Sequence, residues 1–158
     1  MKRINVAVAD DHKYVRAIVC DILAKYGYSV VLQAANGADL LNAISNLEQL
    51  PEICIMDINM PVMDGFIATR EMKKRWPQVK VLGYSINHEK AIIQEMLNSG
   101  ADAFLDKGEL PEKLHEMIQS LLNWTYDIIY NVNNTCKIPP CEHYNFKIRY
   151  NMFVPAYQ

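Results

Sequence analysis

Short apolar runs alternate with longer stretches of helical periodicity over the first 122 residues of the chain. Five runs have the length and apolar character of buried strands: 4–10, 28–35, 52–57, 79–85 and 101–106. After each run, apolar residues recur at spacings of three and four, which predicts five amphipathic helices. Strands that alternate with helices in this way predict an α/β fold, with a parallel sheet covered on both faces.

Capping residues and helix breakers predict the helix ends. Asp64 and Asn87 stand at the starts of the third and fourth helices, where their side chains can accept backbone N–H groups. Gly27 and Gly100 are placed to close the first and fourth helices, and Pro51 is expected to end the second.

Polar side chains follow four of the five predicted strands. Asp10 and Asp11 follow the first strand, Asp57 the third, Ser85 the fourth and Lys107 the fifth. The carboxyl ends of parallel strands meet at one edge of a doubly wound sheet, where ligands bind. We therefore expect three carboxylates, a hydroxyl and an ammonium group to lie close together.

This combination of groups predicts a specific chemistry. Carboxylates that repel one another favour a hard cation such as Mg²⁺, which takes one or two carboxylates and keeps several waters. A cation and Lys107 around Asp57 could offset the charge of a phosphoryl group carried on that carboxylate. The alternative reading makes the aspartates a helix cap and a turn residue and Lys107 a surface lysine, and it must explain four strand ends at once.

Composition narrows the class of protein. The chain has 158 residues, of which 51% are hydrophobic and 22% charged, with a formal net charge of −2. This length has room for one domain with a proper core and an appendage, and this charge gives no general attraction to nucleic acid or membranes. No stretch approaches the roughly 18 apolar residues that span a bilayer. The first apolar run is too short for a signal peptide, so we expect a cytoplasmic protein.

Four motifs carry a resemblance to a known family. "ADDH" (9–12), "MDINMPVMDG" (56–65), "GYS" (83–85) and "GADAFLDK" (100–107) occur in the order and spacing of receiver domains of bacterial two-component response regulators. The resemblance covers residues 4–122 and implies a flavodoxin-like five-stranded parallel sheet with strand order 2-1-3-4-5. It also implies a phosphorelay protein rather than an enzyme.

The resemblance assigns roles position by position. Asp57 corresponds to the phosphoacceptor, and Asp11 and Asp57, with the backbone carbonyl of Asn59, correspond to ligands of Mg²⁺, with Asp10 acting through water. Lys107 is expected to pair with the phosphoryl oxygens and Ser85 to hydrogen-bond the phosphoryl group.

The resemblance also implies a switch and partners. Phe104 corresponds to the aromatic residue whose rotamer follows Ser85, so that phosphorylation repacks the surface of the fourth helix, fifth strand and fifth helix. Phe104 could also be an ordinary core aromatic residue. The expected partners are a sensor histidine kinase or phosphotransfer protein and a downstream protein target.

Two residues depart from the family pattern. Gly108 follows Lys107 where many relatives have proline, so no cis X-Pro bond is available there. Ile86 follows Ser85 where many relatives have a small residue, and we expect it to narrow access to Asp57.

Two other functions share part of this pattern. A haloacid-dehalogenase-like phosphatase also forms an aspartyl phosphate, but it needs a second aspartate as general acid where this chain has Asn59. A receiver that works only as a phosphorylation-independent binding module does not require the full set of carboxylates, hydroxyl and lysine.

The composition changes after residue 122, so we predict a receiver domain over 1–122 and an aromatic-rich extension of unknown structure over 123–158. The 35 residues from Trp124 onward hold eight of the fifteen aromatic residues. "KGELPEKLHEMI" resembles regulators that carry a LuxR-type helix-turn-helix, yet no pair of periodic helices follows. A truncated DNA-binding regulator is therefore the alternative, with direct nucleic-acid binding disfavoured. The extension could mediate a homodimer, and Cys136, Cys141 and His143 offer three zinc ligands without a clear fourth.

Overall fold

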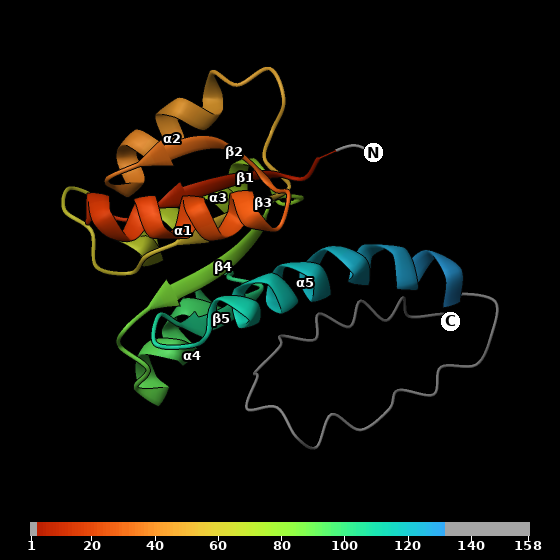
Figure 1. Cartoon of the computed structure of the whole chain (residues 1–158). Coiled ribbons are helices and arrows are strands. Elements are labelled where there is room, and N and C mark those ends of the chain that lie inside the picture. Colours follow the sequence, from red (N-terminus) through yellow and green to blue (C-terminus); the bar gives the residue numbers. More distant parts are fainter. Residues whose placement is uncertain (1–2, 132–158) are drawn as a thin grey trace, which may run out of the picture.

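The computed structural model describes residues 3–131, with side chains described as far as Asn123. Its centre is one parallel sheet with strand order β2-β1-β3-β4-β5 (Figure 1). This architecture confirms the predicted α/β fold class and strand order. The strands are β1 (Asn5–Ala9), β2 (Ser29–Ala34), β3 (Ile53–Met56), β4 (Lys80–Ser85) and β5 (Ala103–Asp106).

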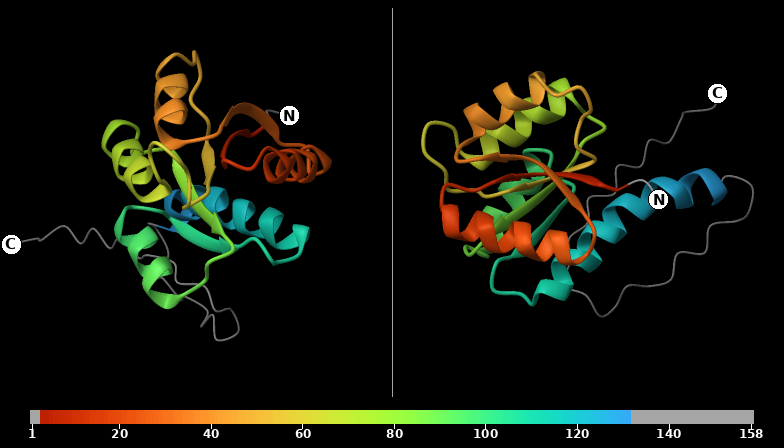
Figure 2. Two further views of the ribbon diagram at one scale, coloured as in Figure 1. Left: turned by 90° about the vertical axis from the view of Figure 1, so that its left-hand side faces the viewer. Right: turned by 45° about the horizontal axis from the view of Figure 1, so that its top comes forward.

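Helices cover both faces of the sheet. Those on one face are α1 (Lys13–Lys25) and α5 (Pro111–Asn131). Those on the other are α2 (Gly37–Ser45), α3 (Gly65–Arg75) and α4 (Lys90–Asn98). Figure 2 shows the two layers of helices on either side of the strands.

β3 and the part of β1 after Asn5 are apolar at every position because they are buried on both faces. Along β1, Val6 and Val8 pack in the core beneath α1 and α5, whereas Ala7 and Ala9 pack in the core beneath α2, α3 and α4. Burial on both faces produces a continuous apolar run rather than an alternating one. This is why the strands could be located from the sequence.

The two predicted N-caps have different outcomes. Asp64 caps α3, since its side chain accepts a hydrogen bond from the backbone N–H of Ile67 at 2.8 Å. The prediction for Asn87 is wrong, because α4 begins at Lys90 and its N-cap residue is Glu89. Asn87 instead accepts the N–H of Glu89, two residues ahead, at 3.1 Å. Asparagine makes such turns as readily as it caps helices.

Helix α2 ends before the proline that was expected to stop it. The last helical residue is Ser45, six positions ahead of Pro51. Ser45 donates its hydroxyl to the carbonyl of Leu41 at 2.9 Å, and the side-chain amide of Asn46 donates to the carbonyl of Asn42 at 2.8 Å. These side chains satisfy late helix carbonyls, so the helix can end without a proline.

Helix α5 crosses the boundary predicted after residue 122. It runs for 21 residues to Asn131, and its later turns extend past the end of the sheet (Figure 1, Figure 2). Among the described residues, no helix is long and apolar enough to cross a membrane. The zinc hypothesis for Cys136, Cys141 and His143 concerns residues outside the described part of the chain, as does most of the aromatic extension.

Candidate functional site

The register of the central strands places two aspartates side by side. Ala9 of β1 pairs with Met56 of β3, so Asp10 and Asp57 leave the sheet next to one another. The backbone N–H of Asp57 donates to the carbonyl of Ala9 at 2.8 Å. Both aspartates are buried, with exposed fractions of 2% for Asp10 and 5% for Asp57. Two carboxylates at this depth require a compensating positive charge.

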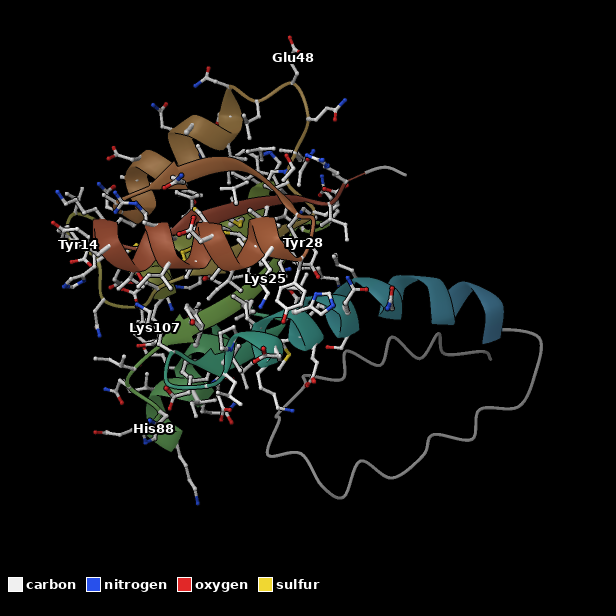
Figure 3. The ribbon with its side chains drawn as sticks, viewed as in Figure 1. Tyr14, Lys25, Tyr28, Glu48, His88 and Lys107 are labelled. Carbon is white, nitrogen blue, oxygen red and sulfur yellow. The ribbon has the colours of Figure 1, made fainter. Side chains whose placement is uncertain are left out.

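Lys107 supplies that charge from the end of β5. Its Nζ lies 2.6 Å from Oδ2 of Asp10 and 2.9 Å from Oδ1 of Asp57, so one ammonium group bridges both carboxylates. The backbone N–H of Lys107 donates to the carbonyl of Ser85 at 3.0 Å, which ties the end of β5 to the end of β4. Figure 3 shows Lys107 at the same edge of the molecule as His88 and Tyr14.

Burial and charge act in opposite directions on these groups. Burial raises the pKa of Asp57, the ammonium of Lys107 lowers it, the charge of Asp10 adds to the increase, and the net shift is upward. For Lys107, burial alone would lower the pKa, but the hydrogen bonds to Asp10 and Asp57 outweigh it, so its pKa is raised. The ammonium is therefore firmly charged, and Asp57 carries a negative charge that is only partly compensated.

The loop after Asp57 is held in a tight conformation. The N–H of Gly65 donates to the carbonyl of Ile58 at 2.8 Å, and a Cβ atom at Gly65 would lie 2.1 Å from the carbonyl oxygen of Asp57. Only glycine permits this approach. Val62 has φ of 65°, which is costly for a β-branched residue. The same loop carries Asn59, whose side chain is exposed.

Asp11 is more exposed than Asp10 and Asp57. Its Oδ1 is 2.8 Å from Nδ1 of His12, and its side chain is 31% exposed. The guanidinium of Arg16 donates to the backbone carbonyls of Asp10 at 2.5 Å and Asp11 at 3.3 Å, which fixes this turn against α1. No role was predicted from the sequence for His12 or Arg16. His12 could have been noticed because it directly follows the paired aspartates, and Arg16 because it lies one turn further on, in α1.

Ser85 and Phe104 lie on the neighbouring strands β4 and β5, on the same face of the sheet. Ser85 is 1% exposed, and its hydroxyl oxygen accepts the N–H of Asn87 at 3.3 Å. Phe104 pairs in register with Gly83 and is half-buried in the core beneath α2, α3 and α4. A Cβ atom at Gly83 would lie 3.2 Å from the ring of Phe104 and 2.8 Å from the side chain of Met96. The absence of a side chain at Gly83 therefore leaves space for the aromatic ring.

The donor atoms suit a hard divalent cation. Asp10 and Asp11, with His12, offer ligand atoms within 4.8 Å of one another. Asp57 adds a third carboxylate, and the ammonium group of Lys107 contacts both this carboxylate and that of Asp10. Carboxylate oxygens are the side-chain ligands that Mg²⁺ takes in proteins, so the residues present fit that ion.

Comparison with known proteins establishes the family. Residues 6–119 match the family model of the response regulator receiver domain, and the chain belongs to this family. The sheet order and the acidic residues at the strand ends agree with this assignment. The predicted family membership is thus confirmed.

Individual relatives show how far the similarity extends. The chain is 31% identical to the chemotaxis protein CheY of Bacillus subtilis, over 75% of this chain and 98% of that protein. It is 36% identical to the transcriptional regulatory protein DegU of Brevibacillus brevis, over 74% of this chain and 49% of that protein. It therefore spans about half the length of DegU.

A solved structure shows the same fold. The CheY-like receiver domain protein of Methanospirillum hungatei JF-1 superposes with a TM-score of 0.73 and 25% identity. The similarity covers 80% of this chain and 99% of that one.

Proposed function

We propose that this protein is a phosphoacceptor of a two-component phosphorelay and is phosphorylated on Asp57. The observation that carries the proposal is the pairing of a buried, incompletely compensated Asp57 with Lys107 at the functional edge of the sheet. The expected phosphodonor is the phosphohistidine of a sensor kinase or phosphotransfer protein. Receiver domains are typically signal transducers, and we assign this chain no enzymatic activity of its own.

The transfer forms one bond and breaks another. A carboxylate oxygen of Asp57 bonds to phosphorus as the phosphorus–nitrogen bond of the donor breaks, and the donor imidazole leaves. Lys107 then offsets charge on the phosphoryl oxygens, while the hydroxyl of Ser85 donates a hydrogen bond to one of them. Asp57 is the nucleophile because it lies at the sheet edge with a lysine already in contact.

A divalent cation belongs to this proposal. Asp11, Asp57 and the backbone carbonyl of Asn59 would hold Mg²⁺ directly, and Asp10 would hold it through water. When bound, the ion would neutralise charge that develops on the phosphoryl oxygens. Lys107 bridges Asp10 and Asp57, so ion binding requires the lysine to share or leave these carboxylates.

The response is proposed to travel through β4 and β5. Movement of Ser85 toward the phosphoryl group would free space near Gly83, beside which Phe104 is half-buried. Repacking of Phe104 would change the surface of α4, β5 and α5 that a downstream protein recognises. Such a change is a shift between two packings, driven by the added charge and acceptor oxygens on Asp57.

A protein partner also fits the exposed apolar residues near the pocket. Tyr14 and Ile18 on α1 are 74% and 59% exposed, and Leu110 before α5 is 69% exposed. Exposed apolar side chains favour protein contact over nucleic-acid contact. The alternative of a truncated DNA-binding regulator draws on the longer DegU-like relatives and would require its determinants in the extension.

The test is phosphorylation by a small acyl phosphate. The full chain is incubated with acetyl phosphate and Mg²⁺, and its intact mass is measured beside Asp57→Asn and the control Asp106→Asn. Asp106 ends β5 but pairs with His88 rather than with Lys107. We expect a single phosphoryl adduct in the wild type and the control, and none in Asp57→Asn. An adduct that persists in Asp57→Asn, or an unmodified wild type, would overturn the proposal.

A further inference from the structure

His12 occupies a position that helix capping does not explain. It is the N-cap residue of α1, where serine, threonine, aspartate and asparagine are preferred because their side chains accept N–H groups. The side chain of His12 makes no such capping bond. Its Nδ1 is directed instead toward Asp11, whose Oδ1 lies 2.8 Å away.

The distances around His12 resemble those within a coordination sphere. Two ligands at right angles around a metal at about 2.1 Å are about 3 Å apart, and opposite ligands are about 4 Å apart. Nδ1 of His12 is 2.8 Å from Oδ1 of Asp11 and 3.9 Å from Oδ1 of Asp10. One cation could therefore contact Nδ1 of His12 and Oδ1 of Asp11 directly, with Asp10 close enough to act through water.

The turn that carries these three residues is fixed before any ion binds. Arg16 donates to the carbonyls of both Asp10 and Asp11, and the N–H of His12 donates to Oδ1 of Asp10 at 2.8 Å. The His12 side chain is 74% exposed, so reorienting its ring breaks no core packing. The backbone is thus rigid while the third candidate ligand remains adjustable.

The chemistry of the added nitrogen determines which ions would gain from it. Mg²⁺ prefers oxygen ligands and dehydrates reluctantly, whereas Mn²⁺ suits the same carboxylates and, as a transition ion, also accepts an imidazole nitrogen beside them. The positive end of α1 opposes every divalent cation at this turn to a similar extent and does not discriminate between them.

We propose that His12 is a ligand of the divalent-cation site and gives the site a preference for a transition ion, represented by Mn²⁺, over Mg²⁺. The inference rests on the proposed function, because it adds one residue to the metal site described there. A purely positional role for His12, in which it only orients Asp11, would support both ions equally.

The experiment measures Mn²⁺ and Mg²⁺ affinity of the full-length protein by isothermal titration calorimetry. The variants are His12→Ala and the matched control His88→Ala, which removes an exposed histidine that pairs with Asp106. We expect His12→Ala to weaken Mn²⁺ binding by about tenfold, with Mg²⁺ affinity changed by less than about twofold. The control should change neither affinity. Electron spin echo spectra of the Mn²⁺-loaded wild type should show nitrogen coupling that His12→Ala removes.

The outcomes separate this inference from the function on which it rests. Equal weakening of both ions, unchanged Mn²⁺ affinity, or absence of the nitrogen coupling would overturn the role of His12. A wild type that binds Mn²⁺ through His12 but does not bind Mg²⁺ would support the inference and contradict the Mg²⁺ part of the proposed function.

Discussion

Asp57 shares its buried environment with a second carboxylate and only one ammonium group. Lys107 contacts both Asp10 and Asp57, so its single charge is divided between two negative charges. Two buried carboxylates that share one ammonium group leave one negative charge uncompensated in the interior. The charge of Asp57 is therefore a cost to the folded state, at the residue proposed as the phosphoacceptor.

Neutralising Asp57 is expected to stabilise the protein at neutral pH. The pKa of Asp57 is raised on folding, mainly by burial, so the folded state binds its proton more tightly than the unfolded chain. The stability that Asp57 contributes is therefore present at low pH and is lost as pH rises through the folded-state pKa. Asp57→Asn should unfold at higher urea concentration than the wild type at pH 7.

The pH dependence provides the control for this prediction. The difference between Asp57→Asn and the wild type should shrink as the pH is lowered toward 3.8, the ordinary pKa of the side chain. Asp106→Asn, at an exposed pair with His88, should not reproduce this trend. A variant less stable than the wild type at pH 7 would show that the lysine compensates Asp57 fully.

Individual site residues differ in how well the sequence located them. Asp10, Asp57 and Lys107 were expected together because the topology of a parallel sheet fixes where strand ends meet, and they are in contact in the structure. The orientation of His12 and the positive φ of Val62 were not foreseen. Both depend on the packing of a short loop, which has no periodic signal in the sequence.

At the scale of elements, the segment between β4 and α4 joins the candidate site to the surface of α4, β5 and α5 that is proposed to signal. It begins after Ser85 and carries Ile86, whose side chain is 73% exposed. Nδ1 of His88 lies 2.7 Å from Oδ2 of Asp106, which joins this loop to the end of β5. An exposed pair of this kind adds about 1 kcal/mol at most, so it would be a small barrier to the movement proposed for Ser85.

Replacement of Ile86 should change the lifetime of the phosphorylated state. We expect phospho-Asp57 to decay faster in Ile86→Ala than in the wild type, because a smaller side chain leaves the mouth of the pocket more open to water. The effect should be less than about tenfold, since Ile86 is largely exposed rather than packed over Asp57. Decay can be followed by phosphate release after donor removal, and equal or slower decay in the variant would refute the expectation.

Element boundaries were the least accurate part of the sequence prediction. The existence and type of all five strands and five helices followed from periodicity, whereas the start of α4 and the end of α2 were misplaced. In both cases a polar side chain forms a local hydrogen bond. Asn87 does so before α4, and Ser45 does so at the end of α2. Such bonds compete closely with one another in energy, so sequence alone does not rank them.

At the scale of the whole molecule, the two cores differ in how they are completed. The core beneath α1 and α5 includes Leu114, Met117, Ile118 and Leu121 from α5. Beyond Leu121 the helix continues to Asn131, and the sequence there includes Trp124, Ile128 and Ile129. The sequence of α5 therefore remains rich in apolar residues beyond those that complete this core.

Removal of the extension is expected to change the state of association. Deletion of 124–158 should change the oligomeric state or solubility of the protein, because the aromatic residues of this region are proposed to cover the receiver or join two copies. Light scattering after size-exclusion chromatography measures the mass in solution. A deletion of 132–158 that keeps all of α5 is the matched control, and an unchanged monomer in the longer deletion would refute the proposal.

The unbroken course of α5 has a mechanical consequence. From Leu121, the last residue of the helix in the core, to Asn131 the helix is about 15 Å long. Each degree of tilt about Leu121 therefore moves the far end by about 0.3 Å. The second half of α5 is therefore a lever arm. A slight rotation of its packed half would become a larger displacement of the helix end at Asn131.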